Sequence, residues 1–68
     1  MKDFETIYEA YGKDIYCFLL KLTNYQSDLA EELTQETFYQ AYLSIARFKN
    51  ESSPYTWICS IAKNVCFK

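Results

Sequence analysis

The stretch RFKNESSPYTWICSIAKN, from Arg47 to Asn64, decides how the chain divides into helices. It begins without a helical period, and Ser53-Pro54 then places a serine cap before a proline at the first position of a helix. After the proline, apolar residues recur at the spacing of one buried helix face: Ile58, Ile61, Ala62 and Val65. The sequence therefore predicts a helix over residues 54–68, and because its pattern is still running at Lys68 we expect the natural element to be longer.

A second helix is predicted immediately before this stretch, over residues 28–46. The polar turn from Thr23 to Ser27 precedes it, and Ser27 or Asp28 is the expected N-cap. Its buried face is expected to contain Leu33, Thr37, Ala41 and Ile45, flanked by Leu29, Ala30, Phe38 and Tyr42. A polar stripe at the same spacing must face solvent or a partner, and consists of Glu32, Gln35, Glu36, Tyr39 and Leu43.

A third helix is predicted at the start of the chain, over residues 3–22, with Asp3 as its N-cap. One face carries the apolar spacing of three and four: Phe4, Ile7, Tyr8, Tyr11, Ile15, Phe18, Leu19 and Leu22. With no strand-like alternation anywhere, we expect residues 1–68 to form one all-α, three-helix domain. A chain of this length buries only about 60% of its surface on folding, so its core must be efficient.

Composition excludes several function classes. The chain has no histidine, which removes the commonest general base and the commonest metal ligand. Its three cysteines form no C-x-x-C pair and cannot all pair with one another, so we expect reduced thiols, no metal and no cofactor. No secretory leader is recognisable, and the apolar run from Ile15 to Leu22 is too short to span a membrane. We therefore expect a soluble, cytoplasmic protein.

Charge is distributed unevenly along the chain. Residues 1–42 carry three lysines against eight carboxylates, a net charge of −5, whereas residues 43–68 carry four basic residues against one acidic residue, a net charge of +3. Two surfaces of opposite sign are therefore expected, and they suit different partners.

The basic part holds the first candidate site, the segment before the 54–68 helix and the start of that helix. Lys49 and Lys63 are suited to phosphates, Phe48, Tyr55 and Trp57 to stacking on unpaired bases, and Asn50 and Asn64 to hydrogen bonds with base edges. The competing interpretation is structural: Trp57 and Phe48 in the core, Ser53-Pro54 as a cap only, and the lysines on an ordinary solvated face.

The second candidate site is the polar stripe of the 28–46 helix. Glu32 and Glu36 lie four residues apart and repel each other by a few tenths of a kcal/mol. An arginine-bearing partner would relieve that repulsion, although a merely solubilising face explains the stripe as well. Acid–base catalysis is disfavoured because the stripe has neither a nucleophile nor a histidine, so we do not expect an enzyme.

Two blocks, DLAEELTQETFYQAY (residues 28–42) and RFKNESSPYTWICSIAKN (47–64), together resemble region 2 of a bacterial RNA polymerase sigma factor of the extracytoplasmic-function (ECF) class. They match, in order and at the family's spacing, an acidic A-E-D/E-L-x-Q-E-T-F helix, then F-[KR]-x-E-S-S-x-x-T-W and I-A-[KR]-N. The chain departs from the family at Ser60, where a basic residue is usual, and at Asn50, where glycine is common.

The resemblance implies a transcription initiation function. Such a domain docks on the clamp helices of the polymerase beta-prime subunit and captures the melted non-template strand of the promoter minus-ten element. It assigns docking to the stripe residues Glu32, Gln35, Glu36 and Tyr39. It assigns contact with DNA to Phe48, Lys49, Asn50, Glu51, Ser52, Ser53, Trp57, Lys63 and Asn64.

The resemblance also implies that part of the family's usual chain is missing and that a further partner exists. The region-4 helix-turn-helix that reads the minus-thirty-five element is absent, so we expect an excised domain or a truncated product, and an anti-sigma factor is a further possible partner. The alternative reading is a helical protein-interaction module that uses the acidic face and binds no DNA.

Overall fold

The computed structural model describes residues 4–47 and 53–67, and within these ranges every element is helical. The elements are α1 (Phe4–Leu22), α2 (Ser27–Ser44), a short 3₁₀ helix η1 (Ile45–Arg47), and α3 (Pro54–Cys66). The predicted all-α, three-helix fold is confirmed for this part of the chain. Asp3, the predicted N-cap of α1, lies outside the described residues. Helix α3 ends at Cys66 with Phe67 as its C-cap, so it stops before the predicted end at Lys68.

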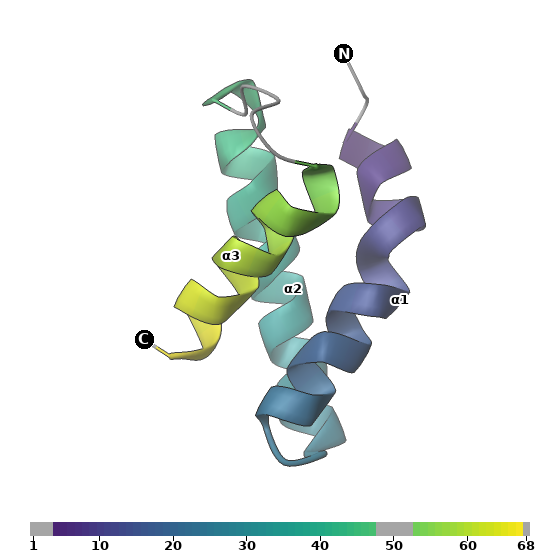
Figure 1. Ribbon diagram of the computed structural model, residues 1–68, viewed down its shortest axis with the longest axis vertical. Helices are drawn as coiled ribbons and strands as arrows, with labels where there is room; N and C mark the ends of the chain where they lie inside the picture. The colour runs from purple at the N-terminus through teal and green to yellow at the C-terminus, as the bar shows by residue number, and fades with distance from the viewer. Residues whose placement is uncertain (1–3, 48–52, 68) are drawn as a thin grey trace.

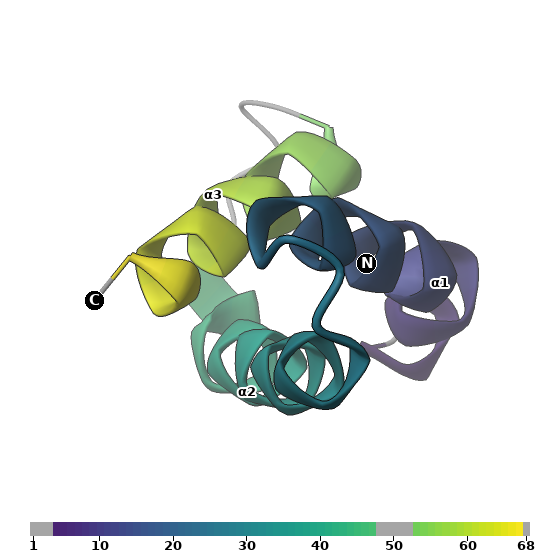
Figure 2. The same ribbon diagram turned by 90° about the horizontal axis from the view of Figure 1, so that it is seen from below.

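The first two helices form an antiparallel hairpin, and α3 crosses it on one side (Figure 1). Seen from below, the three helices surround a common centre, so each has one face toward the other two (Figure 2). All three pairs of helices are in contact. The hairpin leaves a groove between α1 and α2 that is lined by residues of these two helices alone.

The core lies where the three apolar faces meet. Ile15 and Leu19 of α1, Ala30 and Phe38 of α2, and Ile58 of α3 are buried in one cluster. Burying an isoleucine or leucine side chain contributes about 1.5–3 kcal/mol relative to leaving it in water, which makes these few residues decisive in so short a chain. Small residues let the helices approach closely, as Ala41 and Ala62 are also fully buried.

The apolar centre contains one buried threonine whose hydroxyl has a hydrogen-bond partner. Thr37 is fully buried, and its Oγ1 donates a hydrogen bond of 2.7 Å to the carbonyl oxygen of Leu33 one turn earlier. Because a buried hydroxyl without a partner would cost free energy, this bond makes the predicted core position tolerable.

The α1–α2 turn is built from two residues in the left-handed region. Asn24 has φ 59° and Tyr25 has φ 63°. The N–H of Tyr25 donates to the carbonyl of Leu20 at 2.7 Å, and the N–H of Asn24 approaches the carbonyl of Lys21 at 3.4 Å. This is the bonding pattern of a Schellman motif with asparagine in the position that glycine usually takes, and it satisfies the last carbonyls of α1.

The start of α2 differs from the sequence prediction. Ser27 and Asp28 were the expected N-caps, but Gln26 occupies the cap position and its side chain makes no cap hydrogen bond. The helix starts one residue earlier than predicted because the left-handed turn already directs the chain into helical geometry at Ser27. Asp28 instead lies in the first turn, where its negative charge favours the helix N-terminus.

Two of the predicted buried faces are narrower than expected. Tyr8 and Leu22 of α1 and Leu29 and Tyr42 of α2 were assigned to the interior, but all four are exposed. They lie at the edges of their stripes or at a helix end, where the third helix does not reach. Helix α2 also gives way to η1 at Ile45, slightly before its predicted end.

Among the described residues, no helix has both the length and the apolar character needed to cross a lipid bilayer.

Candidate functional site

The predicted polar stripe is a real exposed face of α2. Glu32, Gln35 and Tyr39 are exposed and Glu36 is half-buried, as the spacing predicted. The Nε2 of Gln40 donates a hydrogen bond of 2.9 Å to Oε2 of Glu36, which holds that carboxylate on the helix surface. Helix α2 contains no lysine or arginine, and its acidic residues all lie between Asp28 and Glu36, so the first part of the face is acidic and the part with Tyr39 and Leu43 is uncharged.

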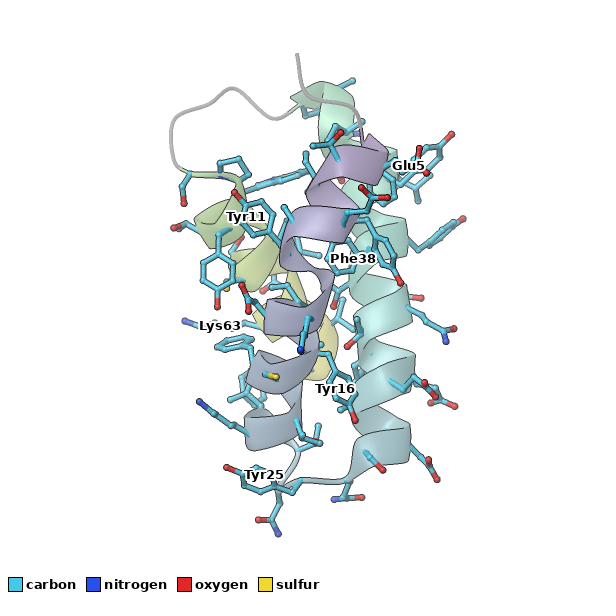
Figure 3. The ribbon with its side chains drawn as sticks, turned by 90° about the vertical axis from the view of Figure 1, so that its right-hand side faces the viewer. Glu5, Tyr11, Tyr16, Tyr25, Phe38 and Lys63 are labelled. Carbon is cyan, nitrogen blue, oxygen red and sulfur yellow. The ribbon has the colours of Figure 1, made fainter. Side chains whose placement is uncertain are left out.

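An aromatic groove lies beside this stripe, between α1 and α2. It has a volume of about 390 Å³, and its lining residues are Phe4, Tyr8, Thr34, Gln35, Phe38, Tyr39 and Tyr42. The groove shares Gln35 and Tyr39 with the stripe, so the two features form one continuous surface. Figure 3 shows Phe38 between α1 and α2, with Glu5 on the adjoining turn of α1.

The groove walls are held by edge-to-face aromatic contacts. The rings of Tyr8 and Phe38 lie 4.9 Å apart at an interplanar angle of 87°, and those of Phe4 and Tyr42 lie 5.3 Å apart at 76°. Such geometry adds about 0.5–1.5 kcal/mol per pair beyond area burial. Sequence reasoning missed this groove, although a signal existed: each helix carries an aromatic pair four residues apart on one face, Phe4 with Tyr8 and Phe38 with Tyr42.

The start of α3 confirms the predicted cap. The Oγ of Ser53 accepts a hydrogen bond of 3.1 Å from the N–H of Thr56, and Pro54 follows the cap directly in the first turn. Trp57 follows in the same turn, half-buried against the core cluster. The position of this tryptophan is therefore fixed by packing, while part of its surface still reaches solvent.

Two polar residues predicted for nucleic-acid contact follow on the outer surface of α3. Lys63 and Asn64 are exposed. Asn64 lies seven residues after Trp57, two helical turns along the same side, with Ser60 between them. The hydroxyl of Ser60, which stands where the family usually has a basic residue, donates a hydrogen bond of 2.7 Å to the carbonyl of Trp57. The structure thus brings Trp57 and Asn64 to one side of α3 and puts Lys63 beside them.

The other predicted contact residues cannot be compared with the structure. Phe48, Lys49, Asn50, Glu51 and Ser52 lie outside the described residues. Of the predicted segment before α3, only Ser53 is described, and it is exposed.

The cysteines do not form a ligand cluster in the described part of the chain. Cys17 is exposed, Cys59 and Cys66 are half-buried, and all are free thiols. No group of three or more potential ligands (histidine, cysteine, aspartate or glutamate) is found among residues 4–47 and 53–67.

One titratable side chain at the α1–α3 contact is perturbed. A hydrogen bond with the Cys59 side chain raises the pKa of Tyr55, and burial and electrostatic interaction with Cys59, Asp14 and Cys17 raise it further. The ring of Tyr55 also lies 5.8 Å from that of Tyr11 on α1. This group lies at a helix contact, apart from the acidic stripe of α2.

Comparison with known proteins identifies the pattern. The family described as Sigma-70 region 2 matches residues 7–68. The chain is 40% identical over 60 residues to the ECF RNA polymerase sigma factor SigM of Bacillus subtilis, covering 88% of this chain and 36% of that protein. It is 39% identical over 61 residues to the ECF RNA polymerase sigma factor SigC of Mycobacterium tuberculosis, covering 90% of this chain and 32% of that protein.

A third relative agrees with these two. The ECF RNA polymerase sigma factor SigX of Bacillus subtilis is 34% identical over 62 residues, covering 91% of this chain and 31% of that protein. The chain thus spans about a third of the length of the curated relatives it matches. No solved structure is significantly similar to it.

Proposed function

The chain belongs to the Sigma-70 region 2 family, a family of sigma factors rather than of enzymes, and from this premise we propose that it docks on RNA polymerase and captures promoter DNA during transcription initiation. The docking partner is the pair of clamp helices of the polymerase beta-prime subunit. The captured DNA is the melted non-template strand of the minus-ten element. These partners belong to the cytoplasm, and an anti-sigma factor that covers the docking face would restrain the activity.

One observation carries the proposal: the acidic face and the residues proposed to contact DNA lie on different helices of one small bundle. The stripe is on α2, and Trp57, Lys63 and Asn64 are on α3. In Figure 3 Lys63 lies on the α3 side, away from Glu5 and Phe38 at the α1–α2 groove. Two partners can therefore be held at once, the polymerase by the acidic face and the DNA strand by α3.

Docking is supported by charge and geometry on α2. Carboxylates at Glu32 and Glu36 lie one turn apart, exposed and half-buried respectively. Arginine forms bidentate, charge-assisted hydrogen bonds with such groups, and the repulsion between the two carboxylates falls when an arginine lies between them. A basic partner helix is the chemistry that fits this face.

Strand capture is supported by the chemistry of α3 and of the segment before it. Taking a base out of its stack costs a few kcal/mol, which stacking on an aromatic ring and hydrogen bonds to base edges can offset. Trp57 offers a ring, Asn64 an amide and Lys63 a cation for phosphates. The segment from Phe48 to Ser53 supplies the remaining proposed contacts, which cradle the flipped base.

The docking step is tested by reversing one charge. The Glu36→Lys variant should bind a beta-prime clamp-helix fragment at least roughly 10-fold more weakly, because it places a cation against a basic partner. Asp14→Lys is the matched control: it makes the same charge change on α1 near Tyr55, away from the stripe, and should bind normally. Equal affinities for the wild type and Glu36→Lys would move the interface elsewhere.

The capture step is tested with a fluorescent single-stranded minus-ten oligonucleotide in the presence of the polymerase clamp. Asn64→Ala and Trp57→Ala should each weaken binding, by about 1–3 kcal/mol for the lost stacking ring. Lys13→Ala, which truncates an exposed side chain on α1 rather than on α3, is the control and should bind normally. Unchanged binding by both α3 variants would show that these residues do not capture the strand.

The same experiment separates the alternative function. A protein-interaction module without DNA binding would lose clamp affinity on Glu36→Lys but would bind the oligonucleotide no better than an unrelated acidic protein. A second readout, the salt dependence of oligonucleotide binding, reports how many phosphates are contacted.

A further inference from the structure

Helix α3 lies beside α1 at its start and not at its end. Both Figure 1 and Figure 2 place the first turns of α3 next to α1 and its last turns away from α1, on the side of α2. A helix moves as a rigid element, so contacts at its start set the direction of the whole of it. The side chains that join the first turns of α3 to α1 therefore decide how α3 crosses the hairpin.

Tyr55 is an α3 side chain that makes this connection. Its ring lies 5.8 Å from the ring of Tyr11 on α1, at an interplanar angle of 40°. Its hydroxyl shares a hydrogen bond with the side chain of Cys59, one turn later on α3. Tyr11 is half-buried and packs against the core cluster, so it is a fixed point on α1. Tyr55 thus attaches two turns of α3 to a well-packed residue of α1.

The contact between α1 and α3 is open beside Tyr55. A pocket of about 220 Å³ lies there, and Tyr55, which is 36% exposed, lines it together with four residues of α1: Asp14, Cys17, Phe18 and Lys21. No other α3 residue lines this pocket in the described part of the chain. Tyr55 therefore carries the packing at this edge of the helix contact, and its loss would leave the start of α3 less firmly held.

The direction of α3 matters because the two proposed partners bind to different helices. The stripe proposed to dock on polymerase is on α2, whereas Trp57 and Asn64 lie on α3. A strand held by the docked polymerase reaches these two residues only when α3 stands at the matching angle to the hairpin. Binding at two linked sites gains nothing when the geometry forbids simultaneous contact.

Tyr55 can hold α3 without covering Trp57. The two residues are two positions apart, which places their side chains about 200° apart around the helix. Tyr55 therefore points toward α1 while Trp57 packs against the core cluster and keeps part of its surface in solvent.

We propose that Tyr55 is a positioning residue, which fixes the start of α3 against Tyr11 of α1 and so orients Trp57 and Asn64 toward the strand that a docked polymerase presents. The inference rests on the proposed strand capture and deepens it, because it adds a residue of α3 and a residue of α1 that act through Trp57 and Asn64. The ring of Tyr55 has the main role, since a thiol is a weak hydrogen-bond partner for its hydroxyl.

A direct contact between Tyr55 and DNA is the competing interpretation, because an exposed aromatic ring can also stack on an unpaired base. Tyr11 separates the two. It belongs to the other helix and supports the Tyr55 ring, so its removal disturbs positioning but leaves the Tyr55 ring available for stacking.

The test uses four variants. Tyr55→Leu and Tyr11→Leu each remove one ring of the contact, and Tyr55→Phe keeps the ring but loses the hydroxyl. Tyr16→Leu is the matched control, because Tyr16 is another half-buried tyrosine of α1 that packs against the core cluster. In Figure 3 Tyr11 lies on the α3 side of α1 and Tyr16 on the α2 side.

Three measurements are made on each variant below its unfolding temperature. The first is affinity for the fluorescent minus-ten oligonucleotide with the beta-prime clamp-helix fragment present, and the second is affinity for that fragment alone. The third is acrylamide quenching of the fluorescence of Trp57, which reports its environment specifically because it is the only tryptophan of the chain. A merely structural role would weaken both affinities together.

We expect Tyr55→Leu and Tyr11→Leu each to weaken oligonucleotide binding roughly 10-fold and to change the quenching of Trp57, with clamp affinity unchanged. The double variant should be no weaker than either single variant, because both remove the same contact. Tyr55→Phe and Tyr16→Leu should bind the oligonucleotide as the wild type does.

The other outcomes overturn the inference in distinguishable ways. Weakening by Tyr55→Leu without weakening by Tyr11→Leu would mean that Tyr55 contacts the strand itself. Equal losses in Tyr55→Phe and Tyr55→Leu would exclude the ring contact as the means of positioning. Parallel losses of clamp and oligonucleotide affinity, or losses matched by Tyr16→Leu, would show a structural role only.

The variants Trp57→Ala and Asn64→Ala separate this inference from the proposed function. If they weaken oligonucleotide binding and Tyr55→Leu and Tyr11→Leu do not, strand capture stands and the positioning inference is wrong. If none of the four affects binding, strand capture by α3 fails and the positioning inference fails with it.

Discussion

At the scale of single residues, Gly12 lowers the free energy of unfolding relative to an alanine at the same position. It lies inside α1 with ordinary negative φ, and a Cβ added there would meet only the Tyr8 ring, at 3.7–3.9 Å, which is normal contact. Alanine lowers the entropy of the unfolded chain and favours helix, so Gly12→Ala should raise the free energy of unfolding by about 1 kcal/mol. Urea denaturation measures this directly, and a decrease would mean that Tyr8 cannot accommodate the methyl group.

Tyr55 should make stability depend on pH at the alkaline end. Its pKa is raised in the folded chain, first by the hydrogen bond with Cys59, so the folded state keeps the phenol proton to higher pH than the unfolded state. The contribution is therefore complete below the ordinary tyrosine pKa of about 10 and is lost as pH rises through the folded value.

Ultraviolet titration of phenolate checks this prediction. The difference between the titrations of the wild type and Tyr55→Phe should have its midpoint above the ordinary value. Tyr55→Phe should also lose less stability than the wild type as pH rises above about 10. A midpoint at or below the ordinary value would contradict the hydrogen bond with Cys59.

At the scale of helices and turns, the Ser53 cap should be measurable on its own. Its Oγ accepts from the N–H of Thr56, so Ser53→Ala leaves that donor without its side-chain partner and should cost about 1 kcal/mol. Ser60→Ala is the control in the same helix. The Ser60 hydroxyl donates to the carbonyl of Trp57, and alanine is a better helix former than serine, so this variant should not lose stability. Chemical denaturation of both variants compares them, and equal losses would show that the cap does not stabilise α3.

The start of α3 could be predicted from the sequence and the start of α2 could not, because different kinds of residue determine them. The start of α3 is encoded locally by Ser53 and Pro54, and the predicted cap is confirmed. The start of α2 depends on the left-handed pair Asn24 and Tyr25, and neither residue carries the glycine signature of such a turn. The prediction therefore chose Ser27 or Asp28 as the cap, whereas the turn had already positioned Gln26.

One part of the candidate site could likewise be predicted from the sequence, and the other part could not. The exposed stripe with Glu32 and Glu36 could be read from the sequence because it follows a single helical period. The groove could not, since it exists only where the hairpin brings Tyr8 against Phe38. Periodicity therefore assigned Tyr8 and Tyr42 to the interior, and only packing between helices reveals that they line an open surface.

At the scale of the whole molecule, opposite charges are separated along the chain and between helices. Residues 1–42 carry a net charge of −5 and residues 43–68 a net charge of +3. Under the proposed function, this arrangement would let a chain that is negative overall offer one surface to a basic protein and another to DNA. It also means that the affinity for DNA should depend on the polymerase complex more than on the isolated chain.

The fold itself should depend on apolar packing and not on cysteine chemistry or metal. The cysteines are free and the fully buried side chains include Ile15, Leu19 and Ile58. Thermal unfolding by circular dichroism should therefore give the same midpoint in reducing buffer with a chelator as in plain buffer.

Ile58→Ala, in contrast, should lower stability by about 2–5 kcal/mol in either buffer, because it opens a cavity where α3 meets the hairpin. For a domain of this size each kcal/mol shifts the midpoint by roughly 4–8 °C, so the two effects are easily distinguished. A midpoint that falls only when the reductant and chelator are added would mean that a disulfide or a bound metal, and not the core, holds the helices together.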